Sequence, residues 1–526
     1  MKTAIHFHHY NWHQQETVWV TGYAWAYGQR LEHQSLADQT LAHTLNFDHF
    51  VRWCEALNGA YAIVVKYEGE VWATVGHSWS HPLFYTIDNK RIEIGDVPHK
   101  LKTAPPAINT EEPIKSYFLA FGVTPGDTTL LEKVYTIRPG ERIRLSGKER
   151  ESIPYCPFPV TKKTAEIEHS DAVLKRAIDR YAPMLSDRQI LLPLTRGYDS
   201  RLLACMLKEA GYNNVLCATW GRAGNAEAKT AGNVAAQLGF AFREIEYNPE
   251  MIENFCSSKQ FESYIGLSGH FTSMPYLQDY FALEYLTSKG IISSSTIALP
   301  GHPGDFVRGS HIKPGMEILN WEQMADSIIE NFATGVKLTK KQQQDVQRLV
   351  MAHFSDGQSA ATPLESFEQW DYEERQCKFV ANSSQVYNHF GIPHAMPLFD
   401  LEIMHHFLAL PPEQRMDGHH YQKVAEAIFE RNGVAFDLKQ NSSQGIASKA
   451  IKQMVKAATP GALKKWYYPS DDIIFYREIT QQLKAFFSGY RFSEPDPPHR
   501  YNAYIVQWYL QWINNQGNEN QQSVKD

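Results

Sequence analysis

The residues best suited to chemistry lie in one short polar turn, 195–200 (TRGYDS), which follows the apolar run 190–194. Residues 201–210 then have helical periodicity, with Gly211 where a helix would end. A strand, a glycine-containing turn and a helix start bring free N–H groups and the positive end of the helix dipole to one place. An ordinary strand–turn–helix corner is the alternative interpretation.

Asp199 restricts which ligands this turn could bind. A carboxylate there would repel a phosphate unless a divalent cation lies between them. The turn also lacks the Gly-Lys-Ser/Thr ending of the Walker pattern. It therefore predicts a site for a metal–nucleotide rather than for a bare phosphate.

A second turn of the same design, 300–305 (PGHPGD), follows the expected strand 291–299 and carries Asp305. Ligands of open parallel sheets lie beyond the carboxyl ends of the strands. Asp199 and Asp305 are therefore expected to face each other across that crevice. Such a pair suits Mg²⁺, which prefers few carboxylates together with water and substrate phosphates.

A doubly wound parallel sheet must position both turns, because residues 166–310 alternate between helix and strand patterns. Residues 1–150 are mostly short strands, typical of an α+β sandwich, and 320–510 are largely helical. Three prolines in 151–163 mark the boundary between the halves. The expected strands are 18–27, 61–67, 71–75, 84–87, 91–94, 189–194, 214–219, 241–247 and 291–299; the expected helices are 36–45, 48–57, 168–183, 201–210 and 226–238.

Bulk composition excludes several classes of protein. The chain has 526 residues, too many for one core, so two or three domains are expected. Lys and Arg number 51 against 58 acidic residues, which gives no sign of a nucleic-acid groove. The six cysteines form no C-x-x-C pair, and no stretch has the apolar length of a signal peptide or membrane span. We therefore expect a soluble cytoplasmic protein.

The chain resembles the asparagine synthetase family, whose relatives include β-lactam synthetases and lasso-peptide cyclases. TRGYDS is similar to the pyrophosphate loop S-G-G-x-D-S of the ATP pyrophosphatases, and PGHPGD to the family's G-x-G-x-D loop. Further similar segments are GAYAIV at 59–64 and HPLFY at 81–85 in the glutaminase half, YFLAFG at 117–122 and IRPG at 137–140 before the synthetase half, NAEAKTA at 225–231, and PLFD at 397–400 for the family's P-F-L-D.

The resemblance implies a degenerate glutaminase-like Ntn-hydrolase sandwich over 1–155. It implies an α/β ATP pyrophosphatase domain with a helical C-terminal part over 165–515, and a disordered tail over 516–526. ATP and Mg²⁺ would serve as cofactors. A small-molecule or peptide carboxylate would be activated as an acyl-adenylate with release of pyrophosphate, and ammonia or an amine would then displace AMP. No nucleic acid or membrane partner is implied, and a homodimer is compatible with this architecture.

The resemblance also implies the roles of individual residues. The expected sites are Thr195, Arg196, Gly197, Asp199, Ser200 and Gly301 for ATP and pyrophosphate; Leu194, Ala218 and Thr219 for the adenine pocket; Asp199 and Asp305 for the metal; and His302, Lys439 and Lys423 for catalysis. For the adenylation lysine, Lys439 is the first candidate and Lys423 the second, and either could instead be a solvated surface residue.

The first departure from the family pattern lies at the amino terminus. The family's glutaminase uses an N-terminal cysteine as nucleophile, whereas position 2 here is Lys2 and the nearest cysteine is Cys54. A protonated lysine cannot replace that thiolate. We therefore predict that glutamine is not hydrolysed.

Other departures affect the synthetase half. Arg196 replaces a glycine; if that position needs a positive φ, the strain is on the order of 1 kcal/mol, which contacts to phosphate could offset. His302 stands where the family has its base, and is either a base or a residue packed in the turn. Pro303 and Phe306 alter the same turn, and Ala395 replaces an arginine, which argues against aspartate as the substrate.

The sequence thus predicts an ATP-dependent, AMP- and pyrophosphate-forming amide ligase or amidotransferase with an inactive glutaminase half. The alternative is a non-catalytic nucleotide-binding or scaffold homologue from a polysaccharide or natural-product biosynthetic cluster. The outcome depends most on what Arg196 does.

Overall fold

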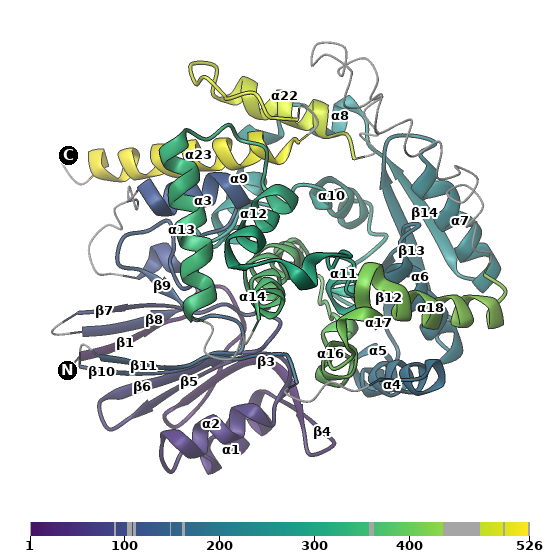
Figure 1. Ribbon diagram of the computed structural model, residues 1–526, viewed down its shortest axis with the longest axis horizontal. Coiled ribbons are helices and arrows are strands. Elements are labelled where there is room, and N and C mark those ends of the chain that lie inside the picture. Colours follow the sequence, from purple (N-terminus) through teal and green to yellow (C-terminus); the bar gives the residue numbers. More distant parts are fainter. Residues whose placement is uncertain are drawn as a thin grey trace.

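The computed structural model describes residues 2–88, 91–101, 108, 112–147, 149–159, 164–356, 362–434, 474–497 and 500–523, with side chains described to 515. Figure 1 shows two layers of strands with α1 and α2 beneath them, one antiparallel and one in which β1 runs parallel to β8, and a separate sheet at the upper right. Helices fill the space between these parts and cover the top of the molecule. The structure is therefore a mixed α/β fold.

The first half is built on two sheets. One has the order β11-β10-β6-β5-β3-β2 with β4 also paired to β3, and the other has the order β1-β8-β7-β9. The strands are β1 (Lys2–His6), β2 (His13–Gln15), β3 (Val18–Ala26), β4 (Gln29–Glu32), β5 (Asn58–Tyr67), β6 (Glu70–Val75), β7 (Phe84–Ile87), β8 (Arg91–Gly95), β9 (Tyr135–Thr136), β10 (Arg142–Ser146) and β11 (Glu149–Ile153).

Both faces of the larger sheet are buried, as β5 illustrates. Side chains alternate between the faces of a strand, so Ile63 and Val65 pack with the core under α1 (His33–Ala42) and α2 (Phe47–Glu55). Ala62 and Val64 point the other way, into the main core of the molecule. The expected strands and the two helical patches of this half are thereby confirmed, with small shifts of their ends.

The second half holds a parallel sheet with the order β14-β13-β12-β15. From β12 the chain continues outward to β13 and β14, and later returns to pair β15 with the other edge of β12. The point where the direction reverses, between β12 and β15, is the place where such sheets bind ligands. The strands are β12 (Gln189–Pro193), β13 (Val215–Gly221), β14 (Ala241–Glu246) and β15 (Thr296–Ala298).

One expected strand is wrong over most of its length. Residues 291–299 were predicted to be extended, but β15 begins only at Thr296. Local polar contacts explain the difference: the N–H of Ser293 donates to Thr296 Oγ1, and the Ser293 and Ser295 hydroxyls bond each other at 2.8 Å. Such contacts favour a turn over a strand ladder.

The helices around the sheets follow the expected order, and α7 has the predicted bounds. Helix α23 includes most of the segment expected to be a disordered tail, and its side chains from 516 onward lie outside the description. The remaining α-helices are α3 (Glu112–Phe121), α4 (Ile167–Arg180), α5 (Ala182–Leu185), α6 (Tyr198–Glu209), α7 (Ala226–Leu238), α8 (Pro249–Ile252), α9 (Lys259–Ser268), α10 (Tyr280–Ser288), α11 (Gly304–Val307), α12 (Trp321–Phe332), α13 (Lys340–Asp356), α14 (Pro363–Trp370), α15 (Gln385–His389), α16 (Leu401–Leu408), α17 (Pro412–Arg415), α18 (His419–Arg431), α22 (Tyr476–Phe486) and α23 (Asn502–Ser523).

Shorter helical turns complete the fold. The segment η4 is a π-helix, a form that is rare over such a length. The others are 3₁₀ turns. These segments are η1 (Pro98–Lys100), η2 (Phe255–Ser257), η3 (Met316–Ile318), η4 (Asp371–Val380), η5 (Ala381–Ser384), η6 (Pro397–Phe399) and η7 (Met416–Gly418).

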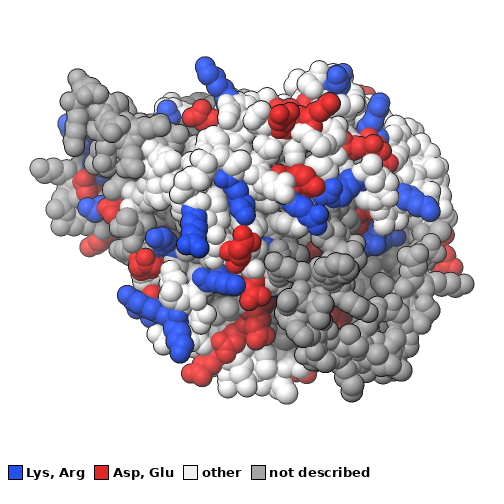
Figure 2. Space-filling view, turned by 90° about the horizontal axis from the view of Figure 1, so that it is seen from above, with Lys and Arg blue, Asp and Glu red and all other residues white. Residues whose placement is uncertain are grey.

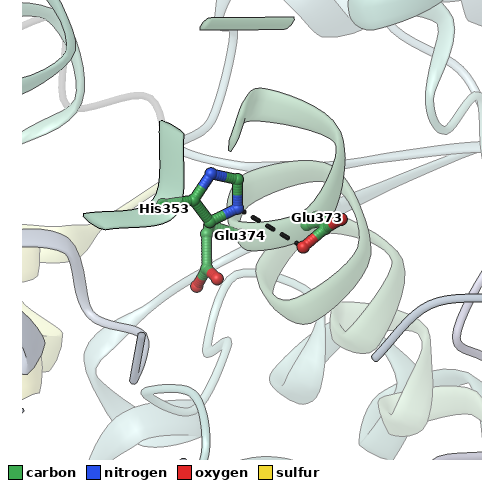
Figure 3. A group of neighbouring side chains, drawn as sticks. All are labelled: His353, Glu373 and Glu374. Carbon is green, nitrogen blue, oxygen red and sulfur yellow. Dashed lines mark hydrogen bonds and ion pairs between the residues drawn. The ribbon is translucent and has the colours of Figure 1, made fainter. Parts of the chain in front are cut away.

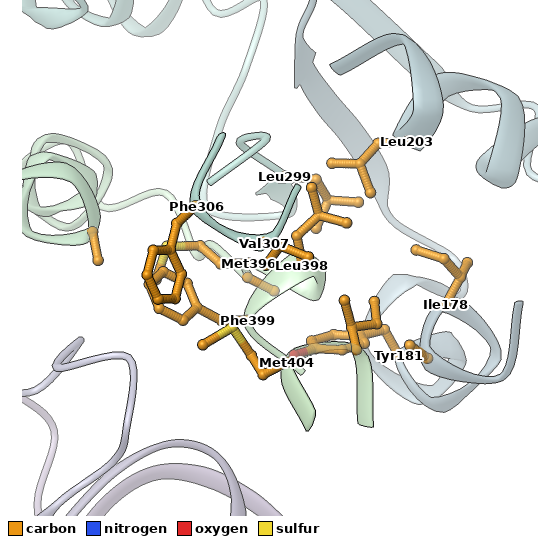
Figure 4. Packing of buried hydrophobic residues seen from close by; sticks show 14 of the residues in the cluster. Ile178, Tyr181, Leu203, Leu299, Phe306, Val307, Met396, Leu398, Phe399 and Met404 are labelled. Carbon is orange, nitrogen blue, oxygen red and sulfur yellow. The ribbon is translucent and has the colours of Figure 1, made fainter. Parts of the chain in front are cut away.

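The segment 397–400 joins the two halves of the chain. Asp400 is buried and accepts hydrogen bonds from Asn58 Nδ2 and Arg180 Nη1. His77 Nε2 donates to the carbonyl of Phe399 at 2.5 Å. Figure 4 shows Leu398 and Phe399 packed among core residues near the turn that precedes α11. The P-L-F-D segment therefore supports the fold at the junction.

The outer surface mixes both signs of charge. On the face in Figure 2, lysine and arginine side chains are interspersed with aspartate and glutamate over the described residues. Within the parts of the chain that the structure describes, helices fall short of the length and apolar character that crossing a bilayer requires.

Candidate functional site

The turn after β12 is organised by its own hydroxyl groups. Thr195 Oγ1 accepts the N–H of Gly197 at 3.1 Å, and Ser200 Oγ accepts the N–H of Thr195 at 3.1 Å. Gly197 begins α6 without a side-chain cap, so the N–H groups of the first helical turn remain available. The turn is exposed to solvent. These features give the turn the properties of an anion site.

Arg201 was missed by sequence reasoning, although it directly follows the turn. It is buried; its Nε donates to the Gly197 carbonyl at 3.0 Å and its Nη2 to the Arg196 carbonyl at 2.6 Å. The guanidinium also lies 5.1 Å from the ring centre of Phe429 on α18. Arg201 thus holds the carbonyls of the turn inward. An arginine one helical turn after a glycine loop was the available signal.

Arg196 does not carry the backbone strain that a positive φ would impose, because its φ is outside the left-handed region. Its side chain lies against α7: Arg196 Nε is 2.8 Å from Glu227 Oε1, and its backbone N–H donates to Glu227 Oε2 at 2.7 Å. The condition under which Arg196 would be strained, a positive φ, is therefore not met. The arginine is held by an acidic residue from the segment 225–231.

The two aspartates predicted to hold a metal are brought together. Asp199 Oδ1 is buried and without a hydrogen-bond partner, and burial together with the neighbouring Asp305 carboxylate raises the pKa of Asp199 to about 7. Gly304 permits this approach, because a Cβ built on it would lie 2.1 Å from Asp199 Cγ. Gly301 also lies close, since its Cβ would be 3.3 Å from Asp199 Cβ. An unpartnered buried carboxylate oxygen beside a second carboxylate fits a divalent cation.

Asp305 is itself partly engaged. Its side chain is about half exposed, and Arg308 Nη2 donates to Asp305 Oδ1 at 2.5 Å. The charge of Arg308 also lowers the pKa of Asp199, although burial and Asp305 outweigh it. Arg308 was not identified from the sequence.

His302 lies in the same turn as Asp305. Burial lowers the pKa of His302 to about 4; the Asp305 carboxylate opposes this shift and the Arg375 guanidinium adds to it. The imidazole is therefore neutral at pH 7, which a general base requires.

Residues expected at an adenine pocket lie at the adjoining strand ends. The N–H of Leu194 donates to the Ala218 carbonyl at 2.8 Å, and Thr219 Oγ1 donates to the Leu194 carbonyl. All three side chains are buried. The structure thus brings these residues beside the turn 195–197.

Of the two lysine candidates, Lys423 is described by the structure, and it does not face the aspartates. Lys423 on α18 is exposed, and the neighbouring Tyr421, two residues earlier, is the one whose side chain faces Asp199. Successive helical residues are separated by about 100°, so Lys423 projects from another side of α18. Lys439 lies outside the described residues.

A separate cluster of His353, Glu373 and Glu374 has spacing that could hold a metal ion (Figure 3). Cationic side chains of the protein already pair with these carboxylates. Lys378 Nζ lies 3.0 Å from Glu374 Oε2. His353 Nε2 lies 3.3 Å from Glu373 Oε2, and Arg138 lies 3.9 Å from the same oxygen. Burial raises the pKa of Glu373, but His353 and Arg138 outweigh burial and bring it to about 2. The cluster is a buried ion network between α13 and η4.

The fold and the site together define a protein with a parallel sheet whose switch point carries an exposed turn with the geometry of an anion site. The asparagine synthase family model matches residues 170–485, more than half of the chain. The chain belongs to the asparagine synthase family, and the matched part is the family's ATP pyrophosphatase domain.

Comparisons with individual proteins add little. No curated protein gives a significant match. A structure described as NMN synthetase from Francisella tularensis is similar at 11% identity, covering 43% of this chain and 94% of that chain, with a TM-score of 0.20. A likeness this slight supports no conclusion.

Proposed function

We propose that the protein is an ATP-dependent carbon–nitrogen ligase. It activates a carboxylate by attack on the α-phosphorus of ATP, which forms an acyl-adenylate and releases pyrophosphate. Ammonia or an amine then attacks the acyl carbon, and AMP leaves. The observation that supports this most is the pairing of Asp199 with Asp305 at the switch point of the sheet, beside the uncapped start of α6.

The residues of the turn would bind the phosphates. The N–H groups at the start of α6, with the Thr195 and Ser200 hydroxyls, are suited to the pyrophosphate and α-phosphate oxygens. Asp199 and Asp305 would hold Mg²⁺, which when bound neutralises phosphate charge. Leu194, Ala218 and Thr219 would lie along the adenine, and Gly301 leaves room for ATP.

His302 is proposed as the group that accepts a proton from the attacking amine. Its pKa of about 4 keeps it neutral, and the adjacent Asp305 carboxylate would stabilise the imidazolium that forms. For the lysine that assists adenylation we propose Lys439 rather than the exposed Lys423.

The first half, 1–155, is proposed to be an Ntn-hydrolase-like domain without glutaminase activity, since position 2 is a lysine. Ammonia or an amine would therefore enter directly. The synthetase domain would span 165–515. We place the protein in the cytoplasm, with no nucleic-acid or membrane partner, and homodimerisation is compatible with this assignment.

A non-catalytic homologue is the second candidate, because Arg308 engages Asp305 and Glu227 engages the backbone N–H of Arg196. Both contacts use groups that a nucleotide site would need. A protein of this kind would bind a nucleotide or a partner without turnover.

Pyrophosphate release separates the two candidates. The purified protein with ATP and Mg²⁺ is screened against pooled carboxylic acids, with Asp199→Ala as the inactive variant and Asp417→Ala, an exposed aspartate on η7, as its control. The ligase releases pyrophosphate only with an acid present, and only when Asp199 is intact. No release with any pool, together with nucleotide binding unaltered by Asp199→Ala, would refute the ligase.

A further inference from the structure

A cavity of about 420 Å³ lies beside the site, between the end of α3, the end of α12, η4 and the start of α23. Its walls are largely aromatic, with the side chains of Phe332, Trp370, Phe379, Tyr476 and Tyr501. Sites for small organic ligands have volumes of roughly 300–1,000 Å³ and are mostly apolar with a few polar groups. The cavity has the size of such a site, and its lining combines these rings with polar groups such as Asn331, Glu374 and Arg375.

The charges around the cavity leave one cation available. Glu374 is neutralised by Lys378, with both side chains fully buried. The Arg500 guanidinium donates hydrogen bonds to the main-chain carbonyls of Ala333 and Glu330. Arg375 has no hydrogen-bond or ion-pair partner within the described parts of the chain. The buried Asp371 carboxylate also interacts electrostatically with Arg375. No hydrogen bond engages the N–H groups of the guanidinium within the described residues, so these donors can bind an anion.

An aromatic ring holds the Arg375 guanidinium in place and leaves its N–H groups free to donate hydrogen bonds. Its guanidinium lies 5.0 Å from the ring centre of Phe332, and that ring stacks on Trp370 at 5.5 Å. An arginine lying over an aromatic face keeps its N–H groups at the edge of its plane, where a carboxylate can receive two of them. The same rings offer an apolar surface next to that edge.

The cavity and the turn with His302 share the wall formed by η4. The two meet where Phe306 packs against Tyr372, whose ring centres are 5.9 Å apart. Burial lowers the pKa of His302, the Asp305 carboxylate opposes this shift, and the Arg375 guanidinium adds to it. His311, just after α11, donates from Nδ1 to Asp371 Oδ2 at 2.6 Å, which fixes the turn to η4. A ligand in the cavity would thus be close to the proposed reacting groups.

We propose that this cavity binds an organic carboxylate with an aromatic or extended apolar body. The carboxylate bonds to Arg375, and the body lies between Phe332, Trp370 and the two tyrosines. We assign this ligand as the acid that the enzyme activates. Its role as substrate rests on the proposed function, whereas its binding to the cavity does not.

The test measures binding without ATP. Titrations followed by ¹⁹F NMR use 3-(4-fluorophenyl)propanoate and its primary amide, which differ in charge but hardly in shape. We expect the carboxylate to bind about tenfold more tightly than the amide, because a charge-assisted bond is lost with the amide. Arg375→Gln removes that difference. Asn331→Trp, at the exposed rim of the cavity, weakens the binding of both probes.

Two controls complete the design. Arg348→Gln removes an exposed arginine on α13 and leaves both affinities unchanged. Asp199→Asn also leaves them unchanged while abolishing pyrophosphate release, so the two proposals fail separately.

Three outcomes would overturn the site: no binding of either probe, equal affinities for both in the unmodified protein, or an unaltered preference in Arg375→Gln. If Arg375→Gln does not fold, the Asn331→Trp variant tests the site instead. Unaltered probe binding by Asn331→Trp would show that the probes bind outside this cavity. If the probes bind as expected but no acid supports pyrophosphate release, the site stands and its role as the substrate site is refuted.

Discussion

Arg196 and Glu227 form a two-point contact in which one carboxylate accepts both the backbone N–H and the side chain of the arginine. The arginine thereby fixes α7 to the turn after β12. Its guanidinium is mostly exposed and is directed to Glu227. The turn tolerates a residue other than glycine here because the backbone is outside the left-handed region.

The first prediction concerns this pair. Arg196→Ala is expected to change ATP affinity less than about threefold and unfolding free energy by less than about 1 kcal/mol, as is usual for an exposed ion pair. Isothermal titration calorimetry and urea denaturation measure the two effects. A tenfold loss of ATP affinity would mean that the guanidinium leaves Glu227 for the phosphates.

Gly304 provides the second prediction. Gly304→Ala brings a methyl group to about 2 Å from the Asp199 carboxylate, and it should displace the turn and lower stability by roughly 1–3 kcal/mol while abolishing Mg·ATP binding. Gly266→Ala on α9 is the matched control, because a Cβ there meets nothing within 4 Å. Wild-type ATP binding by Gly304→Ala would contradict the close approach.

The third prediction follows from the pKa of Asp199. Folding raises this pKa from about 3.8 to about 7, so the folded state holds the proton more tightly. The stabilisation is complete below pH 4 and is lost as pH rises through 7, by at most about 1.4 kcal/mol per pH unit. Without Mg²⁺ at pH 8, Asp199→Asn should therefore have a higher Tm than the unmodified protein.

Adding Mg²⁺ and ATP should reverse that order, because the ligands stabilise only the protein with a carboxylate at 199. Thermal unfolding at pH 5 and pH 8, with and without Mg·ATP, gives the comparison. Parallel pH profiles for the two proteins would show that Asp199 is not perturbed.

A buried histidine gives the fourth prediction. Its contribution to stability changes with pH in the opposite direction to that of Asp199. Burial lowers the pKa of His81 to about 3 and its Nδ1 has no hydrogen-bond partner. Stability from such a group is complete above pH 6.5 and is lost as pH falls toward the folded pKa. His81→Phe should reduce the acid-induced loss of unfolding free energy by up to about 1.4 kcal/mol per pH unit relative to the unmodified protein. Equal slopes in urea titrations between pH 6.5 and 4 would refute this.

The fifth prediction concerns the junction. Asp400→Ala leaves Asn58 without its acceptor and removes one of the two carboxylates that bind Arg180, whose Nη2 still donates to Glu402 Oε2 at 2.7 Å. It should therefore cost about 1–3 kcal/mol of unfolding free energy. Asp417→Ala, where the aspartate pairs with Lys313 at the surface, should cost less than about 1 kcal/mol. A small loss in Asp400→Ala would show that the halves are held together elsewhere.

Periodicity predicted the elements well where apolar spacing is regular. Helix α7 has the expected bounds because Asn225 caps it and Gly239 ends it, and both signals are local. The strand before Asp305 was overestimated because serine contacts among 293–296 compete with the ladder. The local sequence does not reveal whether the serine contacts or the backbone hydrogen bonds of the strand prevail.

The candidate site shows the same limit. The two glycine turns and their aspartates could be predicted, because each is a short motif at a strand end. The partner Glu227 could not be, since its contact with Arg196 depends on how α7 packs against the turn. Arg308 lies three residues after Asp305, a local spacing that sequence reasoning overlooked. The segment 397–400 was recognised by resemblance, but its bonds to Asn58 and His77 come from residues more than 300 positions away.

Those bonds bear on how such a chain evolves. If the first half were deleted, Asp400 would lose Asn58 and the Phe399 carbonyl would lose His77, and apolar side chains now packed at the junction would meet water. Selection for folding alone would then preserve the first half, whatever reaction it does or does not perform. A domain can be retained because its neighbour needs it in order to fold.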